Sequence, residues 1–126
     1  MQKKQGDGRI RYLLVIYEIS RQKEKVKSID VSRALHVSRA SVHNMMQTLS
    51  AEGLVTKDYY GDIVLTETGW AEACRRYEQY LCICELFAQW LKAGPEQAQR
   101  EAMIFLSTQA EDTTERVMQI FAAAEN

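Results

Sequence analysis

Residues 28–53, SIDVSRALHVSRASVHNMMQTLSAEG, constrain the fold more than any other stretch, because they predict two helices joined by a tight turn. Ser28 and Ser38 are each suited to cap the start of a helix, and Gly53 is suited to end the second one. In the second helix the apolar residues recur at i, i+3, i+4 and i+7: Val42, Met45, Met46 and Leu49. This spacing predicts one buried stripe and leaves the opposite face of that helix in solvent.

The exposed positions near the start of the second helix carry hydrogen-bonding side chains, namely Arg39, Ser41, His43 and Asn44. An α-helix fits the major groove of DNA, where Arg can bond guanine, Asn can bond adenine, and Ser can reach a base or a phosphate. This face is therefore a candidate for reading base pairs, with Ser38 beside a phosphate. The alternative is an ordinary helical hairpin whose polar face is only solvated.

Two runs with strand propensity follow Gly53 in LVTKDYYGDIVLTETG, on either side of Gly61-Asp62. Glycine at the first central position of a two-residue loop favours a type II′ turn, so residues 54–60 and 63–66 should pair as antiparallel strands. A short strand around Val26 would complete a three-stranded sheet. Helix, turn, helix and hairpin in this order predict a winged helix-turn-helix.

The predicted hairpin carries Lys57, Tyr59 and Tyr60 near its tip. A tip of this composition can lie along a phosphate backbone or reach into the minor groove. In the alternative interpretation the tyrosines cover the sheet, and we expect at least one of them to do so.

The charge is divided unevenly along the chain although the net charge is only -1. Residues 1–60 hold 11 Lys and Arg against 6 Asp and Glu, whereas residues 61–126 hold 5 against 11. Phosphate neutralisation requires a basic surface only where the protein meets nucleic acid, so the first half is the expected DNA-binding part. Arg9 and Lys27 are further candidates for phosphate contacts, and Lys3 and Lys4 are expected to form a basic arm or a solubilising tail.

The second half predicts three helices that form a dimerisation domain. A long helix of about 24 residues begins at Thr66 or Thr68. A second begins at Pro95, and a third follows Glu111-Asp112. Three helices of this length cannot bury all their large apolar side chains among themselves, so we expect a homodimer through Leu81, Phe87, Trp90, Phe105 and Phe121. The fold class is therefore mainly α, with a winged helix-turn-helix domain over residues 1–69 and a helical domain over residues 70–126.

Several classes of protein do not fit this sequence. No apolar run is long enough to span a membrane and the N-terminus lacks a signal-peptide core, so we expect a cytoplasmic protein with no membrane partner. Three cysteines without an export signal indicate free thiols. No phosphate-binding loop, nucleophile elbow or carboxylate pair with a histidine is visible, and the protein is not expected to be an enzyme.

The run from Ile10 to Gly69 resembles the iron-dependent repressor family of the diphtheria toxin repressor and manganese transport regulator type. The resemblance rests on YLLVIYEI, on VSRASVHNMMQTLSAEGLV, and on YYGDIVLTETG, where the "LT..G" pattern leads into the long helix. It continues more weakly through LFAQWLKAG and the helices that follow. It implies a homodimeric repressor that reads an inverted repeat in double-stranded DNA and has no C-terminal barrel domain.

The resemblance also implies Mn or Fe bound by Asp, Glu and His on the first helix, the long helix and the next helix. The matching positions of this chain are Arg11, Leu14, Tyr80, Met103, Leu106 and Ser107. These side chains do not form a site for a hard cation, so we expect no metal cofactor and no metal switch. The space of the missing site could hold a small apolar effector.

Two other functions compete with the metal-independent regulator. Cys82 or Cys84 with Met103 could form a thiol sensor or a soft-metal site, which would make the protein a thiol- or soft-metal-responsive repressor. Free buried thiols at Cys74, Cys82 and Cys84, acting as small hydrophobic groups, are the expected case. The second alternative is a winged-helix module for protein-protein interaction, against which the basic first half argues.

Overall fold

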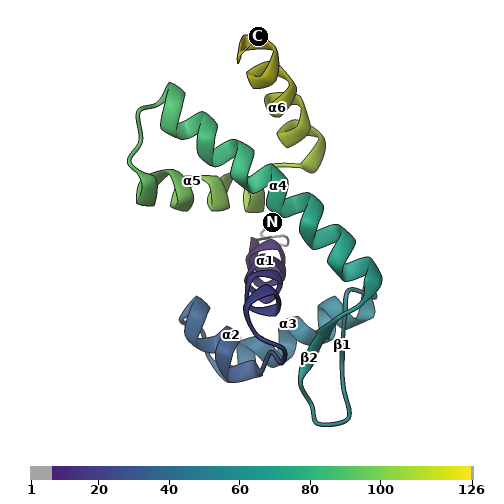
Figure 1. The fold of residues 1–126 in the computed structure, drawn as a ribbon. Helices are drawn as coiled ribbons and strands as arrows, with labels where there is room; N and C mark the ends of the chain where they lie inside the picture. The colour runs from purple at the N-terminus through teal and green to yellow at the C-terminus, as the bar shows by residue number, and fades with distance from the viewer. Residues whose placement is uncertain (1–6, 126) are drawn as a thin grey trace, which may run out of the picture. The chain divides into compact units, whose positions relative to one another are not determined.

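The computed structural model describes residues 7–125, and the expected basic arm at Lys3 and Lys4 lies outside them. The elements in chain order (Figure 1) are α1 (Asp7–Gln22), α2 (Ser28–Leu35), α3 (Arg39–Ala51), β1 (Val55–Lys57), β2 (Ile63–Leu65), α4 (Glu67–Trp90), α5 (Pro95–Thr108) and α6 (Glu111–Glu125). The predicted fold class, a winged helix-turn-helix followed by helices, is confirmed.

The chain divides into two compact units, which are described separately below. The winged unit is Arg11–Arg75, and the helical unit runs from Arg76 and includes the described residues up to Ile10. The domain boundary expected after residue 69 stays a prediction.

The helix-turn-helix forms where its pattern predicts it, with one change at the start of α2. The cap is Lys27 rather than Ser28, because the Asp30 carboxylate accepts a hydrogen bond of 2.9 Å from the Lys27 backbone N–H. The turn between α2 and α3 places His36 in the left-handed region, with φ 58°. Ser32 donates its hydroxyl to the Val37 carbonyl over 2.6 Å and so fastens the turn to α2.

Both ends of α3 have the capping groups that the sequence supplies. Ser38 is its N-cap, as predicted, and its Oγ accepts a hydrogen bond of 3.0 Å from the Ser41 backbone N–H. Gly53 lies one residue beyond the C-cap with φ 77°, a conformation that favours glycine. The Leu54 N–H donates to the Leu49 carbonyl over 3.0 Å, which completes a Schellman end.

The hairpin has shorter strands and a longer loop than the sequence predicted, so the type II′ turn is wrong. Val55 pairs with Leu65 and Lys57 with Ile63, leaving residues 58–62 as the loop. The Asp58 carboxylate accepts hydrogen bonds from the backbone N–H groups of Tyr60 and Asp62, over 2.9 and 3.0 Å. This side chain holds the longer loop closed, which a rule based on glycine alone does not anticipate.

The expected third strand is only a single bridge between Val26 and Ile63, with a hydrogen bond of 2.8 Å from the Ile63 N–H to the Val26 carbonyl. Asp62 strengthens this connection. Its buried carboxylate accepts a hydrogen bond of 2.9 Å from Lys27 Nζ and lies 3.6 Å from Lys25 Nζ. The ion pairs therefore join the hairpin to the segment between α1 and α2.

The core of the winged unit is built around α1. Leu13 and Ile16 are fully buried, as are Val31 of α2 and Val42 and Leu49 of α3. Burial of these side chains is the main stabilising term for the arrangement of the three helices.

In the helical unit, α4 turns a different face inward from the one predicted. The apolar residues of α4 at spacings of 3 and 4 predict an inward stripe of Ala73, Tyr77, Tyr80, Leu81, Cys84, Phe87, Trp90 and Leu91. Ala73 is buried as predicted, but the buried residues from Arg76 onward are Arg76, Gln79, Ile83 and Leu86. Leu81 is 49% exposed and Trp90 is 48% exposed. The apolar pattern alone does not anticipate this face, because Arg76 and Gln79 are polar.

A buried polar network explains how these two residues lie inside. Arg76 donates to the Gln79 side-chain oxygen over 2.6 Å and to the Leu106 carbonyl over 3.3 Å. The Gln79 amide donates to Glu111 over 2.9 Å and to Glu115 over 2.7 Å. Buried polar groups are stable when they are hydrogen-bonded, and this network joins α4 to α5 and α6.

The junction of β2 and α4 depends on a close backbone approach at Gly69. The Thr66 N–H donates to the Leu54 carbonyl over 3.0 Å, and Thr66 Oγ1 accepts from the Gly69 N–H over 2.9 Å. A Cβ at position 69 would overlap the Leu54 carbonyl oxygen. The glycine of the "LT..G" pattern is therefore required by this contact.

Gly69→Ala should lower the free energy of unfolding by about 2–3 kcal/mol, because the added methyl group displaces backbone that has no room to move. Denaturant unfolding measures this loss. Gly94→Ser is the matched control, since Gly94 is the N-cap of α5 and has open space around it. Equal stability of the Gly69→Ala variant and the wild type would contradict the role of this contact.

Asp62→Asn should lower the urea midpoint at neutral pH, and the difference from wild type should shrink in acid. The Lys27 hydrogen bond holds the pKa of Asp62 below its ordinary value, and the same bond raises the pKa of Lys27. A carboxyl with a depressed folded-state pKa stabilises the fold above its ordinary pKa near about 4 and loses this effect as the pH falls below it.

Urea titrations from about pH 7 to about pH 2.5 test the pH dependence of Asp62→Asn. Glu24→Gln is the control, because Glu24 is exposed in the same segment and should leave the midpoint unchanged. A pH-independent difference between Asp62→Asn and wild type would show that the ion pairs are not its cause.

Candidate nucleic-acid interface

The exposed face of α3 carries the four residues predicted to read bases. Arg39, Ser41, His43 and Asn44 are all exposed, and Asn44 lies opposite the buried Val42. The Ser38 and Ser41 hydroxyls are hydrogen-bonded to each other over 3.1 Å, so both belong to the cap at the start of α3. The first two turns of α3 thus present Arg39 and Asn44 to solvent, while the Ser38 hydroxyl caps the start of the helix.

Five basic residues of the winged unit fall into two groups according to their partners. Within the described chain, Arg39 and Lys57 form no ion pair and are exposed. Lys23, Lys25 and Lys27 are instead paired with Asp30 or Asp62. The first group can bind an external anion without breaking an internal contact, and the second group cannot.

The hairpin tip presents both tyrosines to solvent. Tyr59 is 93% exposed and Tyr60 is 77% exposed, with their rings edge to face at 5.1 Å. The expectation that at least one of them covers the sheet is therefore wrong. The reason is the five-residue loop, which carries both rings beyond the paired part of the strands.

Two of the residues predicted to contact phosphate lie in other surroundings. Lys27 is held by Asp62, as described above. Arg9 is half-buried and belongs to the helical unit, so the structure does not bring it together with the residues of α3 in one unit.

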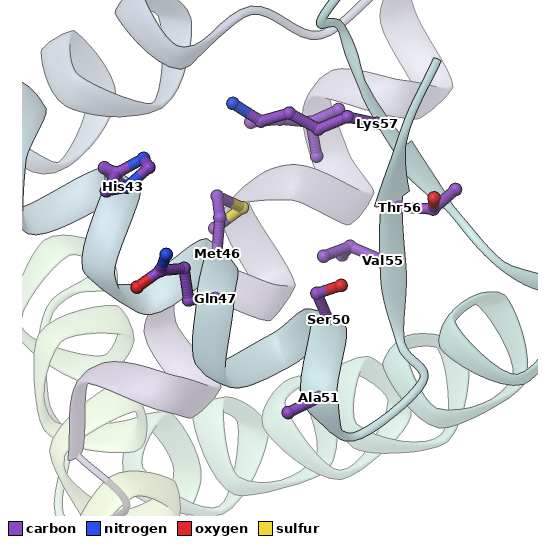
Figure 2. A pocket seen from close by; sticks show the side chains of 9 residues that line it. His43, Met46, Gln47, Ser50, Ala51, Val55, Thr56 and Lys57 are labelled. Carbon is purple, nitrogen blue, oxygen red and sulfur yellow. The ribbon is translucent and has the colours of Figure 1, made fainter.

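A hollow of about 450 Å³ lies between α3 and β1, and no pattern in the sequence predicted it (Figure 2). Met46, Val55 and Ile63 form its floor, and their side chains are almost fully buried. His43 and Lys57 lie at the same end, and the Lys57 side chain extends across that end from β1 (Figure 2). No spacing rule within α3 or β1 alone could predict this site, because it forms only when the two elements meet.

The six positions that the resemblance aligns with the family's metal ligands differ in their burial. Leu14 and Leu106 are buried, Arg11 is exposed, and Tyr80, Met103 and Ser107 are half-buried. Over residues 7–125 there is no group of three or more His, Cys, Asp or Glu side chains that could hold an ion. The donors present, a phenol, a thioether and a hydroxyl, do not suit Mn or Fe.

The three cysteines are free, but they are not all buried as expected. Cys74 is exposed, whereas Cys82 and Cys84 are half-buried. Burial raises the pKa of the Cys82 and Cys84 thiols, which favours the protonated form over the thiolate needed for metal binding or redox reaction. The burial prediction for Cys74 was wrong because α4 turns a different face inward.

The residues expected to form a dimer contact are spread over the surface and interior of the helical unit. Phe87 and Phe105 are half-buried and contact each other edge to face at 6.2 Å. Phe121 is buried against Trp90, with ring centroids 5.2 Å apart, so it fills the core of a single copy.

From residue 7 to residue 125, no helix combines the length and the apolar character that crossing a bilayer requires.

Comparison with known proteins agrees with the arrangement of the winged unit. Residues 10–63 match the family model described as the iron dependent repressor, N-terminal DNA binding domain. No curated protein sequence matches the chain.

Three solved structures have a similar fold. The metal-dependent transcriptional regulator MtsR superposes with a TM-score of 0.78 at 24% identity, covering 90% of this chain and 53% of that chain. The manganese regulator SloR gives 0.77 at 26% identity with the same coverages, and IdeR of T. acidophilum gives 0.73 at 25% identity, covering 97% and 55%. The chain thus spans about half the length of these proteins. Residues 10–63 therefore resemble the N-terminal DNA-binding domain of the iron-dependent repressor family.

Proposed function

We propose that the protein is a homodimeric transcriptional regulator, a repressor, that binds an inverted repeat in double-stranded DNA. The observation that carries this proposal is the exposure of Arg39, His43 and Asn44 at the start of α3. Lys57, which forms no ion pair within the described chain, lies in the same unit. The family match and the likeness to the regulators MtsR and SloR support it.

In this proposal α3 enters the major groove and reads the base edges. Arg39 bonds guanine and Asn44 bonds adenine, since each side chain can make two hydrogen bonds to its base. His43 and Ser41 make further contacts with bases, and Ser38 binds a phosphate at the helix N-terminus. The buried stripe of α3 faces away from the DNA, so the helix can dock without exposing its core.

The hairpin contacts the DNA backbone beside the groove that α3 enters. Lys57 binds a phosphate, while the exposed rings of Tyr59 and Tyr60 reach along the backbone or into the minor groove. Lys27 and Arg9 are weaker candidates, because Lys27 would have to be shared with Asp62 and Arg9 lies in the helical unit.

The helical unit supplies the dimer contact. Its exposed large apolar side chains include Leu81, Trp90, Leu91, Ile104 and Ile120. Apolar surface of this extent marks protein-protein contact sites, and a two-fold dimer presents two recognition helices to two half-sites. Phe87 and Phe105 would contribute through their half-exposed edges. The same surface would serve a different protein partner if the chain were an interaction module.

We propose that this regulator works without the family's metal switch and is not an enzyme. The residues at the ligand positions cannot replace carboxylate and imidazole donors. Loss of DNA affinity on adding a chelator would favour a displaced metal site, and a response to thiol oxidation would favour a sensor at Cys82 or Cys84.

Arg39→Ala should weaken binding to a duplex selected by the protein from a random pool by about 1–3 kcal/mol and relax the preference at one base pair. Lys57→Gln should weaken all duplexes alike and reduce the salt dependence by about one counterion. Fluorescence anisotropy at several salt concentrations measures both effects. Arg116→Ala, which removes an exposed charge from α6, is the control.

Affinity that does not respond to salt, or an Arg39→Ala effect equal for all sequences, would contradict the base-reading role. A tight protein partner together with no DNA binding at low salt would favour the interaction module.

Leu81→Glu should weaken self-association at least about tenfold, because a carboxylate would have to be buried in the dimer contact. Sedimentation equilibrium measures the oligomeric state, and circular dichroism checks that the helices remain. Glu78→Gln is the matched control on an exposed polar position of α4. An unchanged dimer in the Leu81→Glu variant would place the interface elsewhere.

A further inference from the structure

The hollow between α3 and β1 has the composition of a ligand site rather than of an ordinary surface depression. Its volume of about 450 Å³ falls in the range of small-molecule sites, roughly 300–1000 Å³. Its floor is the inner side of Met46, Val55 and Ile63, three side chains that also belong to the core of the winged unit. The base of the hollow is therefore apolar.

The charge around the hollow is of one sign. Lys57 is the only charged side chain among the residues that line it, and these include no Asp or Glu. Within the described chain Lys57 has no ion-pair partner. His43 lies at the same end and can donate a hydrogen bond, and the Gln47 amide lines the α3 side (Figure 2). An anionic group is therefore expected at this end, above an apolar body.

We propose that the hollow binds a small amphipathic carboxylic acid, with its carboxylate against Lys57 and its apolar body over Met46, Val55 and Ile63. The DNA backbone would satisfy Lys57, but it has no apolar group of matching size for the floor. If the proposed DNA-binding function holds, the acid competes with DNA, because Lys57 and His43 cannot bind its carboxylate and the nucleic acid at the same time. The hollow then serves as an inducer site on the DNA-binding face.

Calorimetric titration of the full chain with three probes tests the site without DNA. Naphthalene-2-carboxylate carries both the body and the charge, naphthalene-2-carboxamide carries only the body, and acetate carries only the charge. We expect saturable one-to-one binding of the carboxylate, binding at least about fivefold weaker for the amide, and none for acetate.

Two substitutions test the position of the ligand. Lys57→Gln should weaken the carboxylate about five- to tenfold and leave the amide unchanged. Ser50→Leu should weaken both probes, because it adds a side chain to the wall of the hollow. Lys92→Gln is the charge-matched control, since Lys92 is exposed and lies in the helical unit. Circular dichroism confirms that each variant is folded.

The proposal is overturned if the carboxylate shows no saturable binding, or if Lys57→Gln and Ser50→Leu bind it as tightly as Lys92→Gln does. A second titration follows DNA affinity in the presence of naphthalene-2-carboxylate. Ligand binding that leaves DNA affinity unchanged overturns the competition. Ligand binding to a protein that binds no DNA at all supports the site and refutes the proposed function instead.

Discussion

Burial of Val42, Met46 and Leu49 fixes the rotation of α3, and this rotation decides which side chains of the helix face solvent. Once that stripe packs on the core, His43 and Asn44 are left on the exposed sides of the helix, and Arg39 is exposed because it is the first residue of α3. The caps at Ser38 and Gly53 set where the helix begins and ends, so these side chains lie at a defined end of it. The exposure of His43 and Asn44 therefore follows from apolar packing of the same helix.

Ion pairs divide the basic residues of the first half into those that stabilise the fold and those that can bind a ligand. Asp62 holds Lys25 and Lys27 in the contact between the hairpin and the segment before α2, so these lysines stabilise the fold. Arg39 and Lys57 have no such partner within the described residues, and their positive charge is available to a ligand. A count of lysines and arginines cannot separate these two roles, because the separation depends on a carboxylate more than thirty residues away in sequence.

The sequence was sufficient where short-range physics decides the structure. The spacing of Val42, Met46 and Leu49 and the cap at Ser38 predicted α3, and the residues predicted to read bases are all exposed. Prediction from the sequence failed where contacts between residues far apart in the chain decide the structure. Arg76 and Gln79 lie inside because Glu111, Glu115 and the Leu106 carbonyl bind them. The buried face of α4 therefore differs from the apolar face that its sequence predicts. The hollow beside Lys57 was unpredictable for the same reason, since α3 and β1 each supply only part of its wall.

The most direct test of the DNA-binding face is a nuclear magnetic resonance titration of the nitrogen-15-labelled protein with a duplex it has selected from a random pool. The account predicts that the largest amide shifts fall at residues 39–44 and 57–60, with little change along α6. Shifts concentrated on α5 and α6, with residues 39–44 unaffected, would contradict it.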